Sequence, residues 1–326
     1  EEELLINIQK DAYELAMSAG KLLQRYFRDP LTESEVLKIS YKDAKGRDPV
    51  TAADKEVQEY LSEQIKKRYP DHGIVGEEGD STSDYLPDIV WVLDPLDGTR
   101  NFMHGFPCYA SSIGIMFKGV PVAGAIFIPW PNQDPGIVIH ASNGNGCMVN
   151  EKALETPSIK EVDPNAIITL PGSFTGRFKF DGQFASKAGE PRMGGSIAYE
   201  MSLVALGITE YAVISGSHLW DVLAGIVLVN ESGATSLMQN VGNSYKGDTG
   251  VWSKFENVVD PWESGVTKVS DVRGGVPPLL LAQSGIATTV ASNIQLRQNP
   301  IKKIAKSIFS QISFKRNKTQ KRGMIL

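Results

Sequence analysis

The spacing of the apolar residues changes its period at about residue 70. In the segments 3–27 and 51–69, apolar residues recur every three or four positions, which predicts two amphipathic helices. After residue 70, short apolar runs alternate with Gly, Pro and Asn, which is typical of β-strands. A chain with this order must pack helices against a sheet, so the sequence predicts an α/β protein built in layers.

The expected elements fall into two groups. In the first half, two runs end in acidic residues and three more predict an antiparallel meander: 74–78, 89–94, 109–117, 120–128 and 137–140. In the second half, strands are expected at 166–170, 211–214, 234–238 and 279–282, and helices at 196–206, 220–232 and 285–294. The segment 239–276 is rich in Gly, Asn, Asp and Ser and has little periodicity, which predicts an extended surface excursion.

The composition is that of an ordinary globular protein, and the two cysteines, interpreted as reduced thiols, favour a cytoplasmic compartment. The longest apolar stretch, 111–130, is interrupted by Lys118 and two prolines, so it is too short to cross a bilayer. No secretory leader is visible at the start of the sequence. Cys108 and Cys147 are too few for a disulfide framework and lack the paired spacing of a zinc site, so we expect two reduced thiols.

The charge is distributed unevenly along the chain. The formal net charge is -5, but residues 300–326 hold eight Lys or Arg and no acidic residue. The rest of the chain therefore carries 25 basic against 38 acidic residues, which makes it a poor nucleic-acid binder but suits divalent cations. In the basic tail, apolar and basic residues alternate in a helix-like manner. Two alternatives stay open for it: weak contact with an anionic membrane, or a frayed solvated tail.

The segment Asp94-Pro95-Leu96-Asp97-Gly98-Thr99 carries the strongest chemical signal. Two carboxylates lie three residues apart directly after an apolar run, and the Pro and Gly force the backbone to turn, so both acids are aimed at one point. Two carboxylates in one pocket repel each other unless cations lie between them, which makes such a pair a site for a hard metal ion. The alternative is a plain turn in which Asp94 caps a helix.

Further acidic positions bear on this choice. Glu77 and Glu78 end a predicted strand, Asp54 begins the second predicted helix, and Asp221 opens a late one. Each has a structural alternative: the two glutamates as solvated charges, Asp54 as a favourable charge near a helix start, and Asp221 as a helix cap. The combination of these acids, rather than any one of them, argues for a shared metal site.

Four motifs in this order resemble the inositol monophosphatase family of magnesium-dependent, lithium-sensitive phosphatases. They are residues 48–54 (DPVTAAD), 76–78 (GEE), 91–102 (WVLDPLDGTRNF), and 220–225 (WDVLAG) with 231–233 (ESG). The resemblance covers residues 1 to about 295 and implies a layered αβαβα sandwich, the fold of inositol monophosphatases and fructose bisphosphatases. It implies a homodimer with one catalytic domain over 1–299, in which about 1–160 forms a metal and phosphate lobe and 161–299 a substrate lobe. Residues 300–326 would be a basic tail.

The resemblance also implies a metal centre with two to three Mg2+ ions. Its ligands would be four carboxylates and one backbone carbonyl: Glu77, Asp94, Asp97, Asp221 and the carbonyl of Leu96. Oxygen ligands without Cys or His favour magnesium over zinc. The implied catalytic residues are Asp54 and Thr99, which would position and deprotonate the attacking water, together with Glu77. Hydrolysis of a phosphate monoester has a very high uncatalysed barrier, which such a centre can lower by activating the water and neutralising the phosphoryl oxygens.

The substrate side of the predicted site is less specific. The implied phosphate- and substrate-binding residues lie at two helix starts and in one loop: Gly98, Thr99, Gly195, Ser196 and Lys42. Family members that cleave inositol phosphates have a Glu seven residues before the Asp of the late Trp-Asp motif. Here that position is Ile214, which cannot accept a hydrogen bond from a ring hydroxyl. Ser215, Ser217 and His218 are nearby candidates, and Arg100 could meet a second anionic group.

The predicted function is magnesium-dependent hydrolysis of a small phosphate monoester by an activated water. Inositol monophosphate or a similar polyol or sugar phosphate is the leading substrate. Histidinol phosphate, fructose 1,6-bisphosphate and adenosine 3′,5′-bisphosphate are alternatives within the same fold. A hypothesis of another class is a binding homologue that keeps the fold but has lost turnover, although loss of function usually relaxes such a set of acids.

Overall fold

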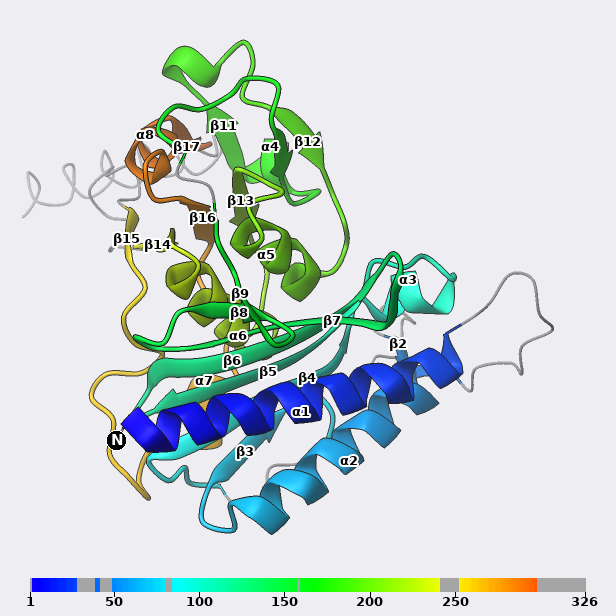
Figure 1. The fold of residues 1–326 in the computed structure, drawn as a ribbon. Coiled ribbons are helices and arrows are strands. Elements are labelled where there is room, and N and C mark those ends of the chain that lie inside the picture. The colour runs from blue at the N-terminus through cyan, green and yellow to red at the C-terminus, as the bar shows by residue number, and fades with distance from the viewer. Residues whose placement is uncertain are drawn as a thin grey trace, which may run out of the picture.

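The computed structural model describes residues 2–27, 39–41, 49–79, 84–156, 159–240 and 252–297. Within these ranges, two β-sheets alternate with layers of helices, as Figure 1 shows. No helix in this part of the chain is both long and apolar enough to cross a bilayer. Lys42 and the tail 300–326 lie outside the described residues, so anion binding by Lys42 and membrane contact by the tail stay predictions.

Two long helices form the first layer: α1 (Glu2–Tyr26) and α2 (Ala52–Arg68). Their apolar stripes pack on each other and on the first sheet, which confirms both predicted helices. α2 begins after Thr51, whose side chain accepts a hydrogen bond from the backbone amide of Ala53 at 3.2 Å. A short antiparallel ladder of β1 (Ile39–Tyr41) and β2 (Pro49–Thr51) precedes it.

Among the described residues, the first sheet has seven strands in the order β3-β4-β5-β6-β7-β8-β9. β3 and β4 run parallel, and from β4 to β9 each neighbouring pair is antiparallel, which confirms the predicted meander. α1 lies along one face of this sheet (Figure 1), and α6 packs on the other. The strands are β3 (Gly73–Gly76), β4 (Ile89–Asp97), β5 (Ala110–Phe117), β6 (Val120–Trp130), β7 (Gln133–Ser142), β8 (Cys147–Val149) and β9 (Lys152–Ala153).

The middle layer consists of α5 (Ile197–Ala205) and α6 (Leu219–Glu231). Nine of the thirteen residues of α6 are buried, as expected for a helix with a sheet on each side. α6 lies very close to the first sheet, because a Cβ added at Gly124 of β6 would come within 2.8 Å of the Cα of Ala224. Glycine at this position therefore permits the contact between helix and sheet.

In the part of the chain that the structure describes, the second sheet has six strands in the order β12-β10-β13-β16-β14-β15, and short elements cover its outer face. This completes an αβαβα arrangement and confirms the predicted fold class. The strands are β10 (Ile167–Thr169), β12 (Glu190–Arg192), β13 (Tyr211–Ile214), β14 (Ala234–Gln239), β15 (Trp252–Lys254) and β16 (Leu279–Gln283). The outer elements are α4 (Phe174–Arg177), the 3-10 helix η1 (Gly182–Phe184), α8 (Ala287–Ser292), and a ladder of β11 (Phe178–Phe180) with β17 (Ile294–Leu296).

The prediction of a surface excursion over 239–276 is only partly right for the described residues 252–276: most of them lie at the surface, but the segment also contributes to the second sheet and to a hydrophobic cluster. β15 adds an edge strand to the second sheet, and α7 (Val269–Val272) buries Val269 and Val272 against residues of β3, β4 and α6. Most of the few apolar residues of this segment are therefore used for packing. The sequence pattern missed them because they do not recur with a regular period.

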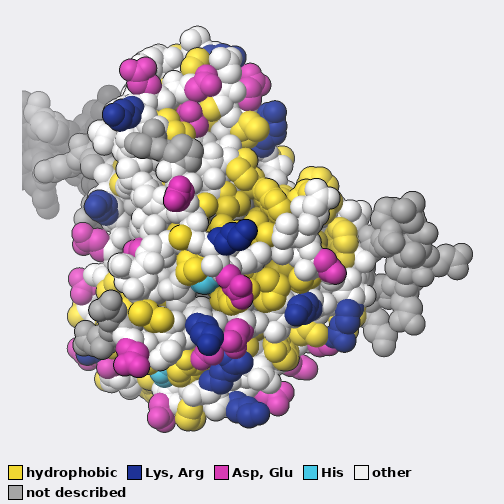
Figure 2. Space-filling model, in the orientation of Figure 1, with side chains coloured by type: hydrophobic (Ala, Val, Ile, Leu, Met, Phe, Trp, Pro, Cys, Tyr) yellow, Lys and Arg dark blue, Asp and Glu magenta, His cyan; other side chains and the backbone are white. Residues whose placement is uncertain are grey.

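Hydrophobic side chains gather between α1 and the second sheet on the face shown in Figure 2. A groove of about 620 Å³ opens there, and we call it the α1 groove. Its apolar lining includes Tyr13, Met17, Trp130, Val149 and Ile208. Cys108 and Cys147 are both buried and free, as expected of reduced thiols.

Candidate active site

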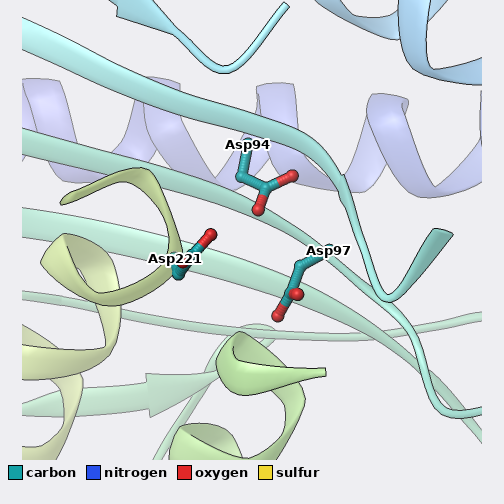
Figure 3. A group of neighbouring side chains, drawn as sticks. All are labelled: Asp94, Asp97 and Asp221. Carbon is teal, nitrogen blue, oxygen red and sulfur yellow. The ribbon is translucent and has the colours of Figure 1, made fainter. Parts of the chain in front are cut away.

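Asp94 and Asp97 lie on a bulge at the end of β4. In a regular strand, residues three apart point to opposite faces of the sheet. Asp94 pairs with Ser112 of β5 and Asp97 pairs with Ala110, so three steps on β4 match two on β5. The extra residue reverses the alternation, and both carboxylates face the same space (Figure 3). The sequence predicted a turn after Asp94, but the strand continues to Asp97 and the turn comes at Gly98.

Gly98 makes the turn from β4 into the short helix α3 (Thr99–Met103). Its φ of 88° lies in the left-handed region, which residues with a side chain rarely adopt. A Cβ at this position would also come within 3.0 Å of the carbonyl oxygen of Cys108. The glycine therefore allows the sharp change of direction that brings the first turn of α3 next to the two aspartates.

The Thr99 hydroxyl links α3 to the start of α2. Its oxygen lies 3.3 Å from Oδ1 of Asp54 and 3.1 Å from the carbonyl oxygen of Leu96. Oδ2 of Asp54 accepts hydrogen bonds from the amide (2.9 Å) and the hydroxyl (2.5 Å) of Thr51. Burial raises the pKa of Asp54 to about 6, although the bonds from Thr51 oppose this shift. Thr99 and Asp54 are thus placed to pass a proton from one to the other.

Asp221 reaches the same space from the first turn of α6 (Figure 3). Its Oδ2 accepts a hydrogen bond from the amide of His218, three residues earlier, at 2.7 Å. Asp54 stands in the same relation to Thr51 at the start of α2. The structural alternatives considered for these residues, a cap and a favourable charge in the first turn, are compatible with a second role. Each caps its helix through one oxygen, and both face the region of the β4 bulge.

The three aspartates form a compact cluster of carboxylates. One oxygen from each of Asp94, Asp97 and Asp221 lies within 4.8 Å of the other two (Figure 3). Burial and the neighbouring Glu77, Asp97 and Asp221 raise the pKa of Asp94 well above its usual range. Burial and Asp221 do the same to the pKa of Asp97. Such mutually repelling carboxylates fit divalent cations, and an all-oxygen donor set fits the predicted Mg2+.

Glu77 joins this cluster through Asp94. It follows β3 directly, and its amide donates to the carbonyl of Leu93 at 3.0 Å, which extends the contact between β3 and β4. Its side chain forms a hydrogen bond with the side chain of Asp94, which contributes to the raised pKa of Asp94. The parallel pairing of β3 and β4 therefore delivers Glu77 and Asp94 to one edge of the first sheet.

The start of α5 contacts Asp97 rather than an open pocket. Oδ2 of Asp97 accepts hydrogen bonds from the Ser196 hydroxyl at 2.9 Å and from the Ala198 amide at 2.5 Å. The sequence prediction placed the amides of Gly195 and Ser196 near the substrate. In the structure, the Gly195 amide donates to Oε1 of Glu200 at 3.0 Å, so in this conformation it does not point at a substrate. The sequence could not reveal that a buried acid occupies it.

Glu200 and Asn101 shape the site and were not predicted from the sequence. Besides Gly195, Glu200 accepts the amide of Gly194 at 2.6 Å, and burial raises the pKa of Glu200 to about 7. The Asn101 side-chain amide donates to the carbonyls of Cys108 at 2.6 Å and Gly194 at 2.8 Å. These bonds fix the turn before α5. The sequence signal that could have identified Glu200 was an acid in the first turn of a largely apolar helix.

The expected substrate-binding wall is apolar at the position of Ile214, as the sequence predicted. Ile214 ends β13 and is only 1% exposed. Beyond it, the hydroxyl of Ser215 accepts a hydrogen bond from the Arg177 guanidinium at 3.3 Å. The His218 ring stacks on the ring of Trp220, with 4.7 Å between centroids. His218 therefore has a packing contact in addition to its place at the start of α6.

Comparison with known proteins decides the family. The model of the inositol monophosphatase family matches residues 5–307. The chain belongs to this family. The Nus factor SuhB of Xylella fastidiosa is 32% identical over 226 residues, which cover 67% of this chain and 77% of that protein. Inositol monophosphatase 2 of Saccharomyces cerevisiae is 30% identical over 220 residues, 62% of this chain and 74% of the yeast protein. The solved structure of a Thermotoga maritima IMPase matches with a TM-score of 0.63 at 21% identity and covers 88% of this chain and 96% of that one.

Membership in the inositol monophosphatase family determines the reaction class. Members are metal-dependent phosphatases that hydrolyse phosphoric monoesters, and this chain is an enzyme of that class. The hypothesis of a binding homologue without turnover is therefore set aside. The cluster of Asp94, Asp97 and Asp221 agrees with this class, because it offers the oxygen ligands that such a metal centre needs.

Proposed function

We propose that the enzyme uses Mg2+ to hydrolyse a small phosphate monoester, with inositol monophosphate or a similar polyol or sugar phosphate as its leading substrate. The observation that carries the proposal is the cluster of Asp94, Asp97 and Asp221 beside the Thr99 and Asp54 pair. Three carboxylates this close are costly unless cations neutralise them. When bound, the cations would supply the positive charge that lowers the pKa of a nearby water and neutralises the phosphoryl oxygens.

Thr99 and Asp54 would take the proton from the attacking water. As the Thr99 hydroxyl accepts that proton, it can pass its own to Oδ1 of Asp54, 3.3 Å away. Oδ2 of the same carboxylate is held by Thr51, which keeps Oδ1 directed at Thr99. Asp54 accepts a proton only in its ionised form, so its pKa of about 6 suits activity near neutral pH. In this scheme water attacks directly, and no phosphorylated enzyme forms.

The remaining residues would hold the ions and the phosphate. Glu77, Asp94 and the Leu96 carbonyl are the proposed ligands of one ion, and the three aspartates those of a second. A third, weaker ion would share Glu77. The phosphate would lie at the start of α3, where the amides of Gly98 and Thr99 precede the first intrahelical bonds. The bonds from Ser196 and Ala198 keep Asp97 in one orientation, as the supporting contacts of metal ligands commonly do.

Two observations bear on the alcohol part of the substrate. The yeast relative is named as an inositol monophosphatase, which supports inositol monophosphate. Ile214 offers no acceptor for a ring hydroxyl, so a polyol bound here would have to be held by other groups. Ser215 and Arg177 lie just beyond Ile214 and are the proposed polar contacts on that wall.

We also propose that the enzyme is a cytoplasmic homodimer, is inhibited by lithium and does not bind nucleic acid. The apolar α1 groove supports the homodimer, because a second copy could cover it. The two free cysteines agree with a reducing compartment, and the acidic charge outside the tail disfavours nucleic acid.

Phosphate release from a panel of esters tests this proposal. The panel contains inositol 1-phosphate, histidinol phosphate, fructose 1,6-bisphosphate and adenosine 3′,5′-bisphosphate, each with Mg2+, with Mg2+ and Li+, and with a chelator. We expect chelator-sensitive, lithium-inhibited release that is fastest with a polyol phosphate. Asp97→Asn should reduce it by at least about 100-fold, because a ligand of the ions is lost. Asp181→Asn is the matched control, because Asp181 lies in the exposed outer layer. This variant should release phosphate at the rate of the wild type.

Magnesium-independent release, or no release from any ester, would overturn the proposal. Trapping a covalent phosphoryl-enzyme during turnover would contradict direct attack by water.

A further inference from the structure

The segment 252–276 lies between two loops that carry proposed metal ligands. On one side it is hydrogen-bonded to residues seven and nine positions after Glu77: the Leu86 amide donates to the Thr267 carbonyl at 2.8 Å, and the Val269 amide donates to the Asp84 carbonyl at 3.0 Å. On the other side, the Val276 amide donates to the Ser217 carbonyl at 2.8 Å, next to the start of α6. The segment therefore connects the Glu77 loop with the loop that leads to Asp221.

Arg273 spans the distance between these two loops with its side chain. One guanidinium nitrogen, Nη2, donates to the carbonyl of Gly76 at 2.9 Å and to that of Gly79 at 3.1 Å. These two carbonyls lie directly before and after the pair Glu77 and Glu78, so Arg273 holds both ends of that turn. Its guanidinium also lies over the ring of Trp220, 5.8 Å from the centroid. Trp220 directly precedes Asp221 in α6.

The anchor of Arg273 is well packed. Arg273 follows α7, whose Val269 and Val272 are buried with Val75 of β3 and Leu223 of α6. The same hydrophobic cluster thus joins α7, the strand that leads to Glu77 and the helix that carries Asp221. Because Arg273 directly follows α7, this packing fixes the position of its backbone. Its contacts with both loops are not those of a freely moving surface arginine.

We propose that Arg273 is a positioning residue for the carboxylate site: it holds the Glu77 turn and the start of α6 in register and thereby sets the affinity for Mg2+. The inference rests on the metal site of the proposed function. Arginine suits the task because its guanidinium has several donors in a fixed plane and can bond two carbonyls while it lies over an indole ring, whereas an ammonium group is a compact point charge without a planar face. Loss of a residue that orients metal ligands typically weakens metal binding by about 10- to 100-fold.

Arg297 provides a matched control. Its Nε donates to the carbonyl of Phe178 at 3.1 Å, so it too links an arginine side chain to a backbone carbonyl. It does so at the β11 and β17 ladder, on the outer face of the second sheet. Arg273→Met and Arg297→Met both remove such a contact, but only the first removes it beside the carboxylates. Arg273→Lys keeps the charge and a donor but loses the planar geometry.

The experiment is calorimetric titration of the full chain with Mg2+, together with the Mg2+-induced rise in melting temperature. We expect Arg273→Met to weaken Mg2+ binding by about 10- to 100-fold and to reduce the rise accordingly. Arg297→Met should bind Mg2+ like the wild type, even if both variants melt at similarly lowered temperatures without metal. Arg273→Lys should bind Mg2+ more tightly than Arg273→Met but several-fold more weakly than the wild type.

Three outcomes would overturn the inference, and they can be told apart. Wild-type binding by Arg273→Met, or by Arg273→Lys if the Met variant does not fold, would show that Arg273 contributes only to stability. Equal weakening by Arg297→Met would show a general loss of stability. A wild-type chain that binds no Mg2+ would overturn the proposed metal site itself, and the inference with it.

Discussion

The starts of α2 and α6 share one local motif but lie in different surroundings. In each, an aspartate in the first turn accepts a hydrogen bond from the amide three residues earlier: Asp54 from Thr51 at 2.9 Å, and Asp221 from His218 at 2.7 Å. The side chains that donate hydrogen bonds to Asp54 are two hydroxyl groups, those of Thr51 and Thr99. Opposite Asp221 are two other carboxylates, those of Asp94 and Asp97.

This difference shows that the local motif does not decide the chemistry. A carboxylate surrounded by hydroxyl donors can exchange protons with them, so Asp54 is suited to be a base. A carboxylate that faces others of the same charge calls for a cation, so Asp221 is suited to be a metal ligand. The partner that tertiary packing places opposite each helix start makes the distinction.

Asp221→Asn should have the largest effect. Asparagine can still accept the His218 amide, but the cluster loses one charge and the ions lose a ligand. We expect Mg2+-dependent phosphate release to fall by at least about 1,000-fold, which corresponds to about 4 kcal/mol of transition-state stabilisation. The melting temperature without metal should stay the same or rise, since repulsion in the cluster is relieved. Activity within about ten-fold of the wild type would show that the two helix starts do not differ as argued.

Asp54→Asn should have a smaller effect of a different kind. The helix cap is again preserved, and we expect kcat to fall by about 100- to 1,000-fold, as for the loss of a general base, while Mg2+ binding is unchanged. Because the pKa of Asp54 is raised to about 6 by burial, its ionised form is lost as the pH falls below that value. The kcat of the wild type should therefore decrease as the pH falls below about 6. Bound cations lower the pKa of Asp54 and would move this decrease to a lower pH.

The pH profile provides the control for this second variant. kcat of Asp54→Asn should show no acid limb from this group between about pH 5 and 7, when measured at saturating Mg2+ and substrate. A variant that keeps the acid limb of the wild type would rule out Asp54 as the base.

Glu200 extends the comparison to a third helix start, that of α5, and should show the smallest effect. Burial raises the pKa of Glu200 to about 7 from an ordinary 4.5, so folding favours its protonated form. The contribution of Glu200 to the free energy of unfolding is therefore complete below pH 4.5, and it is lost as the pH rises from 4.5 to about 7. The loss is at most about 3 kcal/mol. Glu200→Gln cannot ionise and should not show this loss.

Urea unfolding of the wild type and Glu200→Gln at pH 4.5 and pH 8 measures this effect. Other titrating groups are common to both proteins, so they cancel in the comparison. The wild type should lose up to about 3 kcal/mol relative to the variant between the two pH values. A difference that is the same at both pH values would refute the prediction.

Much of the fold was predictable because its signals are local. The periodic apolar residues of α1 and α2 and the antiparallel meander follow directly from hydrophobic spacing. The acids of the candidate site were also identified from their positions after apolar runs or at helix starts. The packing of 252–276 was not predictable, because its apolar residues are few and aperiodic and bury themselves against β3 and α6.

The sequence by itself determined which acids are present, roughly where the main helices and strands lie, and that a buried strand leads to Asp94, with Asp97 three residues later. Only the tertiary structure decided how these groups meet. The bulge on β4 turns two aspartates to one side, and the positions of α2 and α6 give two similar caps different partners. Glu200 occupies the Gly195 amide, which the sequence had assigned to the substrate. The physical reason is that hydrophobic spacing and capping act within a few residues, whereas electrostatic and hydrogen-bond partners depend on distances that only the folded chain sets.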